Sequence, residues 1–181
     1  MSNYFEETRV WIFGCAATYN GDCGYHIIDE DNPNTIVVTI PAENAINGVI
    51  EVKISVLESG LDVMWYYAST ALKEDKDMSA DEKYRIAADI ATSYNNFMDS
   101  TDELATHTLC INREDGDIYW HSFYSRRLFY PWSKDGMAVL KDIFYTQPER
   151  LERLCYPIFG ALIGKIPTET ANAMIEKIRK E

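Results

Sequence analysis

The second half of the chain constrains the fold most, because it alternates helix, β-hairpin and helices with almost no catalytic chemistry on them. Ser79 and Glu82 have the spacing of a capping box, in which each side chain satisfies a backbone N–H of the first helical turn. The apolar residues that follow recur every three to four positions: Ile86, Ile90, Tyr94 and Phe97. This spacing predicts a helix with one apolar stripe that packs on a sheet.

A β-hairpin is predicted on both sides of Asp115-Gly116, a dipeptide that tolerates the positive φ values of a two-residue turn. Its strands are Thr106–Glu114 and Asp117–Tyr124. With a two-residue loop, the register pairs Glu114 with Asp117, Ile111 with Trp120, Cys110 with His121 and Leu109 with Ser122. One face then carries Leu109, Ile111, Ile118 and Trp120, and the other carries Cys110, Tyr119, His121 and Phe123.

After Pro131 the pattern is helical to the end of the chain. Ser133 is predicted to cap one helix, and Thr146 with Glu149 forms a second capping box. Pro157 falls inside the next apolar stripe and is expected to kink or split that helix. Gly164 is placed to end it, and Thr168 to cap a last helix.

The first seventy residues favour strands at Thr8–Thr18, Cys23–Ile28, Thr35–Ile40, Ile50–Val56 and Leu61–Ala68. The clearest is Ile50–Val56, where apolar and polar residues alternate. Tyr4–Tyr19 also tolerates a helical reading, and strand is the preferred one. Together the patterns predict one α+β domain over residues 1–181: a mainly antiparallel, twisted sheet of six or seven strands, helices on one face, and a helical C-terminal third.

The whole chain has a formal net charge of −12, and its acidic residues are concentrated in the first part. Residues 1–105 carry 6 Lys and Arg against 19 Asp and Glu, whereas residues 106–181 carry 11 against 10. Such a field repels polyanions, so a nucleic acid is not expected as a partner. Basic or neutral proteins fit better, and solubility alone is an equally good reason for the acidity.

Neither a catalytic nor a metal-binding site is predicted. Cys15, Cys23, Cys110 and Cys155 form no C-x-x-C pair, and the glycines form no phosphate-binding loop. Cys110 opposite His121 is the one pair of catalytic type, but a mid-strand thiol lacks a helix N-terminus or an oxyanion hole. The acidic clusters lack the spacing of a calcium loop. No cofactor and no metal are therefore expected.

An aromatic segment with two arginines follows the hairpin, and it is the predicted partner-binding surface. Aromatic and Arg side chains dominate binding hot spots because they bury large areas with few rotatable bonds. The alternative is that the aromatics fasten the hairpin to the helices while the arginines face water. The predicted residues are Tyr119, Phe123, Arg126, Arg127, Phe129, Tyr130 and Trp132.

The order of elements resembles the YbjN-type family, whose fold is shared with type III secretion chaperones. The resemblance rests on a helix ending in Ser93-Tyr-Asn-Asn, the hairpin Leu109–Phe123 and the helical segment Met137–Ile163, preceded by the hairpin Ile50–Ala68. The strands before residue 45 and the broken C-terminal helix depart from it. It implies a dimeric, non-enzymatic protein that binds proteins or modulates stress and signalling responses.

The predicted function is thus that of a non-enzymatic, chaperone-like bacterial protein that binds a protein partner or a second copy of itself as a homodimer. The longest apolar runs are too short to cross a bilayer, and no secretion signal is recognisable, so a cytoplasmic location is expected. Two alternatives are an immunity protein that neutralises a basic toxin and an enzyme for small molecules with an unrecognised site.

Overall fold

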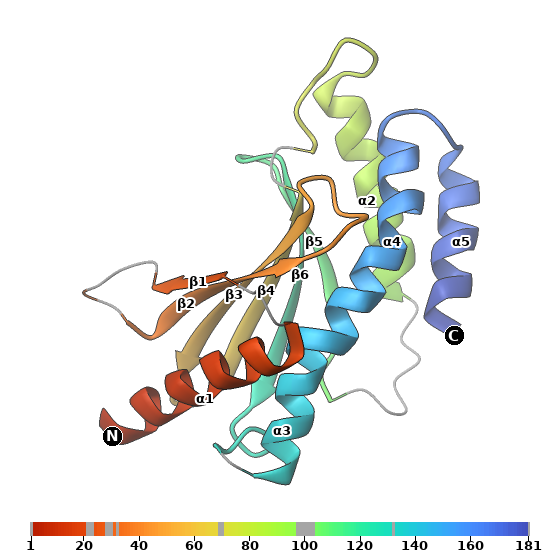
Figure 1. The fold of residues 1–181 in the computed structure, drawn as a ribbon. Helices are drawn as coiled ribbons and strands as arrows, with labels where there is room; N and C mark the ends of the chain where they lie inside the picture. The colour runs from red at the N-terminus through yellow and green to blue at the C-terminus, as the bar shows by residue number, and fades with distance from the viewer. Residues whose placement is uncertain are drawn as a thin grey trace.

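The computed structural model describes residues 2–20, 24–27, 31, 33–68, 71–96, 104–131 and 133–180, without the side chains of 2, 3, 19, 20, 25–27, 67 and 68. Figure 1 shows a sheet flanked by helices. The elements, in chain order, are α1 (Ser2–Asn20), β1 (Gly24–Ile27), β2 (Thr35–Pro41), β3 (Val49–Leu57), β4 (Gly60–Ala68), α2 (Ala80–Asn96), β5 (Thr108–Asn112), β6 (Asp117–Ser125), α3 (Lys134–Lys141), the π-helical turn η1 (Asp142–Thr146), α4 (Gln147–Leu162) and α5 (Thr168–Lys180).

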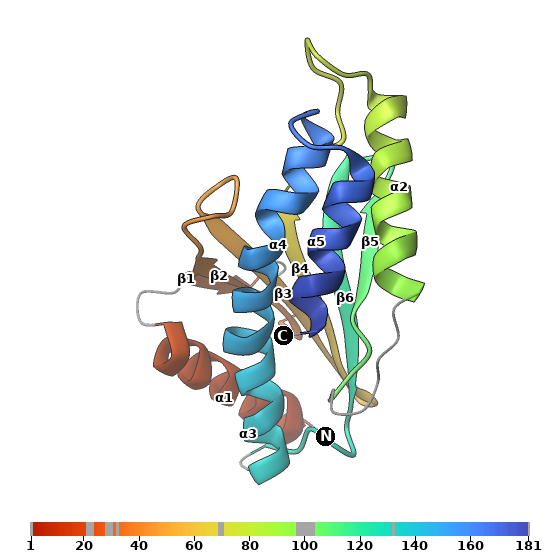
Figure 2. The ribbon, with the colours of Figure 1, turned by 90° about the vertical axis from the view of Figure 1, so that its right-hand side faces the viewer.

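The strands form one antiparallel sheet in the order β1-β2-β3-β4-β6-β5. Alternation decides which side chains enter the core: in β3 the even-numbered residues are buried and the odd-numbered ones are not. The registers continue this buried layer across the sheet, with Val52 opposite Trp65 and Trp65 opposite Trp120. Helices α2, α4 and α5 lie in front of the strands in Figure 2, so they cover the face that carries these residues.

The α+β class is confirmed, but the prediction of six or seven strands is wrong in its N-terminal part. Thr8–Thr18 is not a strand, because it lies inside helix α1. The predicted strand Cys23–Ile28 is reduced to the four residues of β1 at the sheet edge, and Cys23 and Ile28 lie outside the described residues. The body of the sheet is therefore β2 to β6.

Burial explains why this segment is helical. The buried side chains of α1 are Thr8, Trp11, Ile12, Cys15 and Ala16, whereas Val10 is 57% exposed. The buried positions recur at three- and four-residue steps, which is one face of a helix, and a strand would bury alternate residues instead. Helix α1 thus joins the core, where Trp11 stacks on Phe129 with ring centroids 5.4 Å apart.

The hairpin of β5 and β6 exists, but its predicted register is wrong by two residues. Ile111 lies opposite Ile118 and Leu109 opposite Trp120. The loop has four residues, because the Asn112 side chain accepts from the Glu114 N–H and donates to Asp115. Gly116 closes the loop at φ 77° and donates to the Asn112 carbonyl. A shift of two residues keeps every side chain on its predicted face.

The helix boundaries follow the predicted caps in part. Ser133 caps α3 by accepting from Gly136 N at 2.9 Å, and Glu82 N donates to Ser79 at the start of α2. Thr146 is not a cap: its backbone is helical, and α3, η1 and α4 follow one another without a break. Pro157 lies within α4 and does not split it. Gly164, at φ 69°, follows the end of α4.

Candidate functional site: the open face of the sheet

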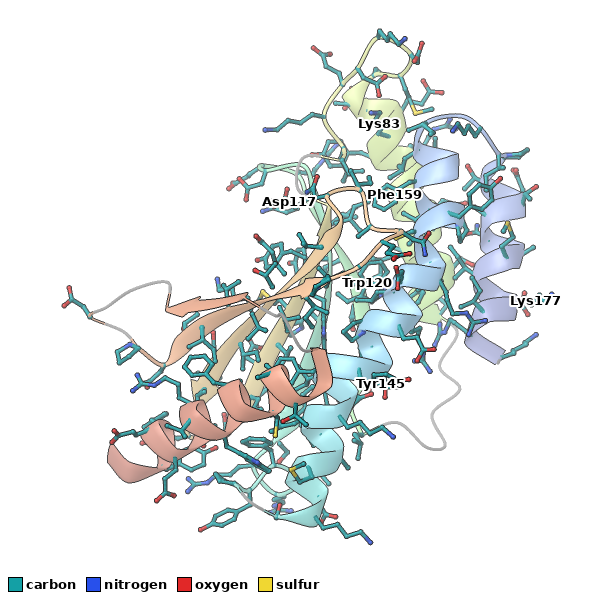
Figure 3. All side chains as sticks on the ribbon, in the orientation of Figure 1. Lys83, Asp117, Trp120, Tyr145, Phe159 and Lys177 are labelled. Carbon is teal, nitrogen blue, oxygen red and sulfur yellow. The ribbon has the colours of Figure 1, made fainter. Side chains whose placement is uncertain are left out.

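No described helix packs on the second face of the sheet, which we call the open face. It consists of the outward side chains of four neighbouring strands, all partly or fully exposed. Trp120, by contrast, lies between the sheet and the helices (Figure 3). The open face comprises Glu51, Lys53 and Ser55 of β3, Asp62, Met64 and Tyr66 of β4, Asp117, Tyr119, His121 and Phe123 of β6, and Thr108 and Cys110 of β5.

The centre of the open face holds a hydrogen-bonded polar pair between neighbouring strands. His121 Nε2 lies 2.6 Å from Asp62 Oδ1, with 36% of the His121 and 26% of the Asp62 side chain exposed. Phe123 lies directly opposite Asp62, and its side chain is 42% exposed. An exposed aromatic ring and a polar pair therefore stand side by side, and aromatic residues are enriched at protein interfaces relative to the rest of the surface.

Two tyrosines stack at the other end of the open face. Tyr66 and Tyr119 lie opposite each other, with ring centroids 5.4 Å apart and an angle of 24° between the rings. Partial burial raises the pKa of Tyr66, and the carboxylates of Asp117, Asp115 and Glu51 raise it further. This end of the open face therefore has a negative potential.

The edge of the sheet beside the open face is closed to a further strand. The Asn95 amide on α2 donates to the Leu109 carbonyl at 3.0 Å and accepts from the Leu109 N–H at 2.9 Å. The Tyr84 hydroxyl donates to the Arg113 carbonyl at 2.8 Å. Side chains thus occupy backbone groups of β5 that an added strand would need, and the open face remains the accessible part of this side of the sheet.

The predicted partner-binding residues do not form one surface. Tyr119 and Phe123 lie together on the open face, but Arg126 turns away, with its guanidinium 4.2 Å from the centre of the Tyr4 ring on α1. Arg127 and Tyr130 are exposed. Phe129 is fully buried against Trp11, which removes it from any partner surface. Trp132 lies outside the described residues.

Cys110 and His121 do not form the pair that the predicted register gave. Cys110 lies opposite Tyr119, and His121 lies opposite Thr108. Burial also raises the pKa of the Cys110 thiol, whereas a nucleophilic cysteine needs a lowered one. The open face therefore does not activate this thiol.

Sequence reasoning missed a buried polar network beneath the opposite face. His107 Nδ1 lies 2.5 Å from Ser122 Oγ, and the Ser122 hydroxyl donates to the Thr106 carbonyl at 3.1 Å. Ser122 Oγ is therefore within hydrogen-bond distance of both the Thr106 carbonyl and the His107 ring.

The other side of His107 completes the network. Gln147 Nε2 lies 2.9 Å from His107 Nε2 and 3.0 Å from Asp142 Oδ1, and the Tyr124 hydroxyl donates to Asp142 Oδ2 at 2.6 Å. These contacts tie β6 to η1 and α4. One signal was present in the sequence: alternation along β6 places the polar Ser122 on the buried face.

A hollow lies on the helical side, between α4 and the loop after β2. Its volume is about 440 Å³, and its apolar lining includes Ile46, Tyr156, Phe159 and Ile163. Asn44 donates to Glu152 beside it at 2.9 Å and 3.2 Å. It lacks the combination of stacked rings and excess negative charge that characterises the open face.

Within the described part of the chain, no helix is long and apolar enough to cross a membrane, and no group of three or more His, Cys, Asp or Glu residues is arranged to hold a metal ion. Comparisons with models of protein families, with curated proteins and with solved structures gave no match to this chain.

Proposed function

We propose that this chain is a non-enzymatic protein-binding protein that takes a protein partner on the open face. The observation that carries the proposal is a sheet face on which no described helix packs and where Phe123, Tyr66 and Tyr119 are accessible beside charged groups. Tyrosine is among the residue types enriched in the few hot spots that carry most of the binding free energy at protein interfaces. Because Asn95 occupies the backbone groups of Leu109 at the β5 edge, a partner would bind to the open face rather than add a strand at this edge.

The cysteines bear on the cellular location of the protein. We propose the bacterial cytoplasm as the place of action, which suits the free thiols of Cys15 and Cys110, because thiols stay reduced there. The resemblance to the YbjN-type family stays a prediction. It agrees with a protein-binding role without being needed for it.

The test compares two exposed aromatics on opposite sides of the molecule. Phe123→Ser removes an aromatic ring from the open face, and Tyr145→Ser removes a similarly exposed one, at 49%, from η1 on the helical side. Tagged wild type and variants capture proteins from the native host, and the captured partner is then purified for titration calorimetry. We expect Phe123→Ser to weaken binding at least tenfold, while Tyr145→Ser binds like wild type.

Thermal unfolding of the three proteins shows whether they are equally folded. A third variant, Tyr156→Ser, alters the hollow beside α4. Loss of binding in Tyr156→Ser with full binding in Phe123→Ser would move the site to that hollow and contradict the proposal. Equal binding by wild type and all three variants would show that neither the open face nor the hollow binds the partner, and would also contradict the proposal.

A further inference from the structure

One end of the open face combines an aromatic stack with a carboxylate on the next strand. The register places Glu51 of β3 directly opposite Tyr66 of β4, and Tyr66 opposite Tyr119 of β6. Side chains in directly opposite positions have Cβ atoms about 5 Å apart. The Tyr66 ring therefore has the Tyr119 ring on one side and the Glu51 strand on the other.

The charges around this stack are mainly negative. Asp117 lies on the open face two residues before Tyr119, and Asp115 is in the adjoining loop. Lys53 is the cation nearest along β3, but its register partner is Met64 rather than Tyr66. The raised pKa of Tyr66 supports the same conclusion, because Asp117, Asp115 and Glu51 are among its causes. A ligand that meets this end of the face gains from a positive charge.

Elsewhere the chain stacks its own arginines on tyrosines. Arg126 lies over Tyr4, Arg113 over Tyr84 and Arg179 over Tyr94, with guanidinium-to-ring distances of 4.2, 5.2 and 4.5 Å. Every lysine and arginine of the chain is among the described residues, and none of them lies over Tyr66 or Tyr119. The stack on the open face thus has the surroundings of a cation–π site without a cation of this chain.

We propose that Tyr66, Tyr119 and Glu51 form a subsite that receives an arginine side chain of the protein partner, an inference that rests on the proposed function. The guanidinium plane stacks on the exposed part of the Tyr66 ring, and its N–H groups donate to the Glu51 carboxylate. Arginine fits better than lysine, because its planar, forked group makes both contacts at once. A second copy of this chain would instead bring its own negative charge to this end.

The test uses a defined probe instead of the unidentified partner. The isotope-labelled protein is titrated with the blocked peptide acetyl-Gly-Arg-Gly-amide, and backbone amide shifts are followed by NMR. We expect shifts concentrated at Glu51, Tyr66 and Tyr119. The peptide with citrulline, which has the same shape without the charge, should give none there, and the lysine peptide should bind about two- to fivefold more weakly.

A matched pair of variants separates the subsite from general attraction to an acidic protein. Glu51→Gln and Glu43→Gln change the net charge equally, but Glu43 is an exposed residue in the loop after β2. Glu51→Gln should raise the dissociation constant of the arginine peptide about two- to fivefold, and Glu43→Gln should leave it unchanged. Shifts spread over the acidic surface, equal effects of both variants, or no localised shifts would each overturn the inference.

The partner-binding variants distinguish an error in the arginine subsite from an error in the proposed function. If the captured partner is lost in Phe123→Ser but kept at full affinity in Glu51→Gln, the open face binds a partner and the arginine subsite is wrong. If Phe123→Ser keeps the partner, the proposed function itself is wrong, whatever the peptide does.

Discussion

A single side-chain amide satisfies the backbone of Leu109 at the β5 edge of the sheet. Asn95 replaces the neighbouring strand that Leu109 lacks, since it satisfies both the N–H and the C=O of that residue. Asn95→Ala leaves both groups without these partners and should lower the free energy of unfolding by about 1–3 kcal/mol, as urea denaturation would show. Asn95→Asp keeps the acceptor for the Leu109 N–H but sets a carboxylate oxygen against the Leu109 carbonyl, so it should also be less stable than wild type. Equal stability of Asn95→Ala and wild type would mean that water satisfies this edge.

A second residue-scale prediction concerns pH. Asp75 accepts from Lys83 Nζ at 2.5 Å and from two backbone N–H groups, and these contacts lower its pKa to about 2. A lowered folded-state pKa stabilises the fold above the unfolded value of 3.8, and this effect is lost as the pH falls through about 2. Asp75→Asn should therefore be less stable than wild type at pH 7, and the difference should shrink between pH 4 and 2.

The measurement is denaturant unfolding at a series of pH values. Glu74→Gln removes a charge from the same loop and serves as the control, with stability close to wild type at pH 7. A difference between Asp75→Asn and wild type that stays constant down to pH 2 would show that the ion pair does not contribute in this way.

At the scale of single elements, two glycines should respond oppositely to the same substitution. Gly60, at φ 151°, begins β4, and a Cβ there would overlap the backbone carbonyl of Tyr124 on β6. Gly60→Ala should destabilise the fold by roughly 2–4 kcal/mol through backbone strain and overpacking. Gly14 is exposed within α1 with open space around it, so Gly14→Ala should stabilise by roughly 0.5–1 kcal/mol. Thermal unfolding of both variants tests the pair, and a stable Gly60→Ala would contradict the tight β4–β6 contact.

Elements were predictable from the sequence where a local pattern determined them. Alternation gave the β3–β4 hairpin and the faces of β5 and β6, because burial has a period of two. The register of β5 and β6 was not recoverable from Asp115-Gly116, since the Asn112 side chain stabilises a longer loop. Helix α1 was missed because Val10–Phe13 looks like a strand. The spacing of Thr8, Trp11, Ile12 and Cys15 was the stronger signal.

The candidate site was predictable only in part, for reasons of topology. Tyr119 and Phe123 were identified because they lie in one strand with a clear alternation. Their neighbours Asp62 and Tyr66 come from β4, and nothing local in the sequence shows that β4 lies between β3 and β6. Phe129 was misplaced for the same reason, since its partner Trp11 lies in a helix more than a hundred residues earlier.

On the scale of the whole molecule, charge distinguishes two occupants of the open face. The net charge of −12 makes two copies repel each other, whereas a partner that presents arginine is attracted. Salt screens both effects, because the Debye length falls from about 10 Å at 0.1 M to about 3 Å at 1 M. Partner binding should therefore weaken as salt rises, and self-association through the open face should strengthen.

Self-association of the chain as a homodimer should depend on salt. Sedimentation equilibrium should find the chain mainly monomeric at 0.05 M salt and more dimeric at 0.5 M, since screening removes repulsion while the apolar contact of Phe123 remains. Phe123→Ser should abolish the increase, and Tyr145→Ser should preserve it. A dimer already complete at 0.05 M salt, and unaffected by Phe123→Ser, would place self-association on another surface and leave the open face to a basic partner alone.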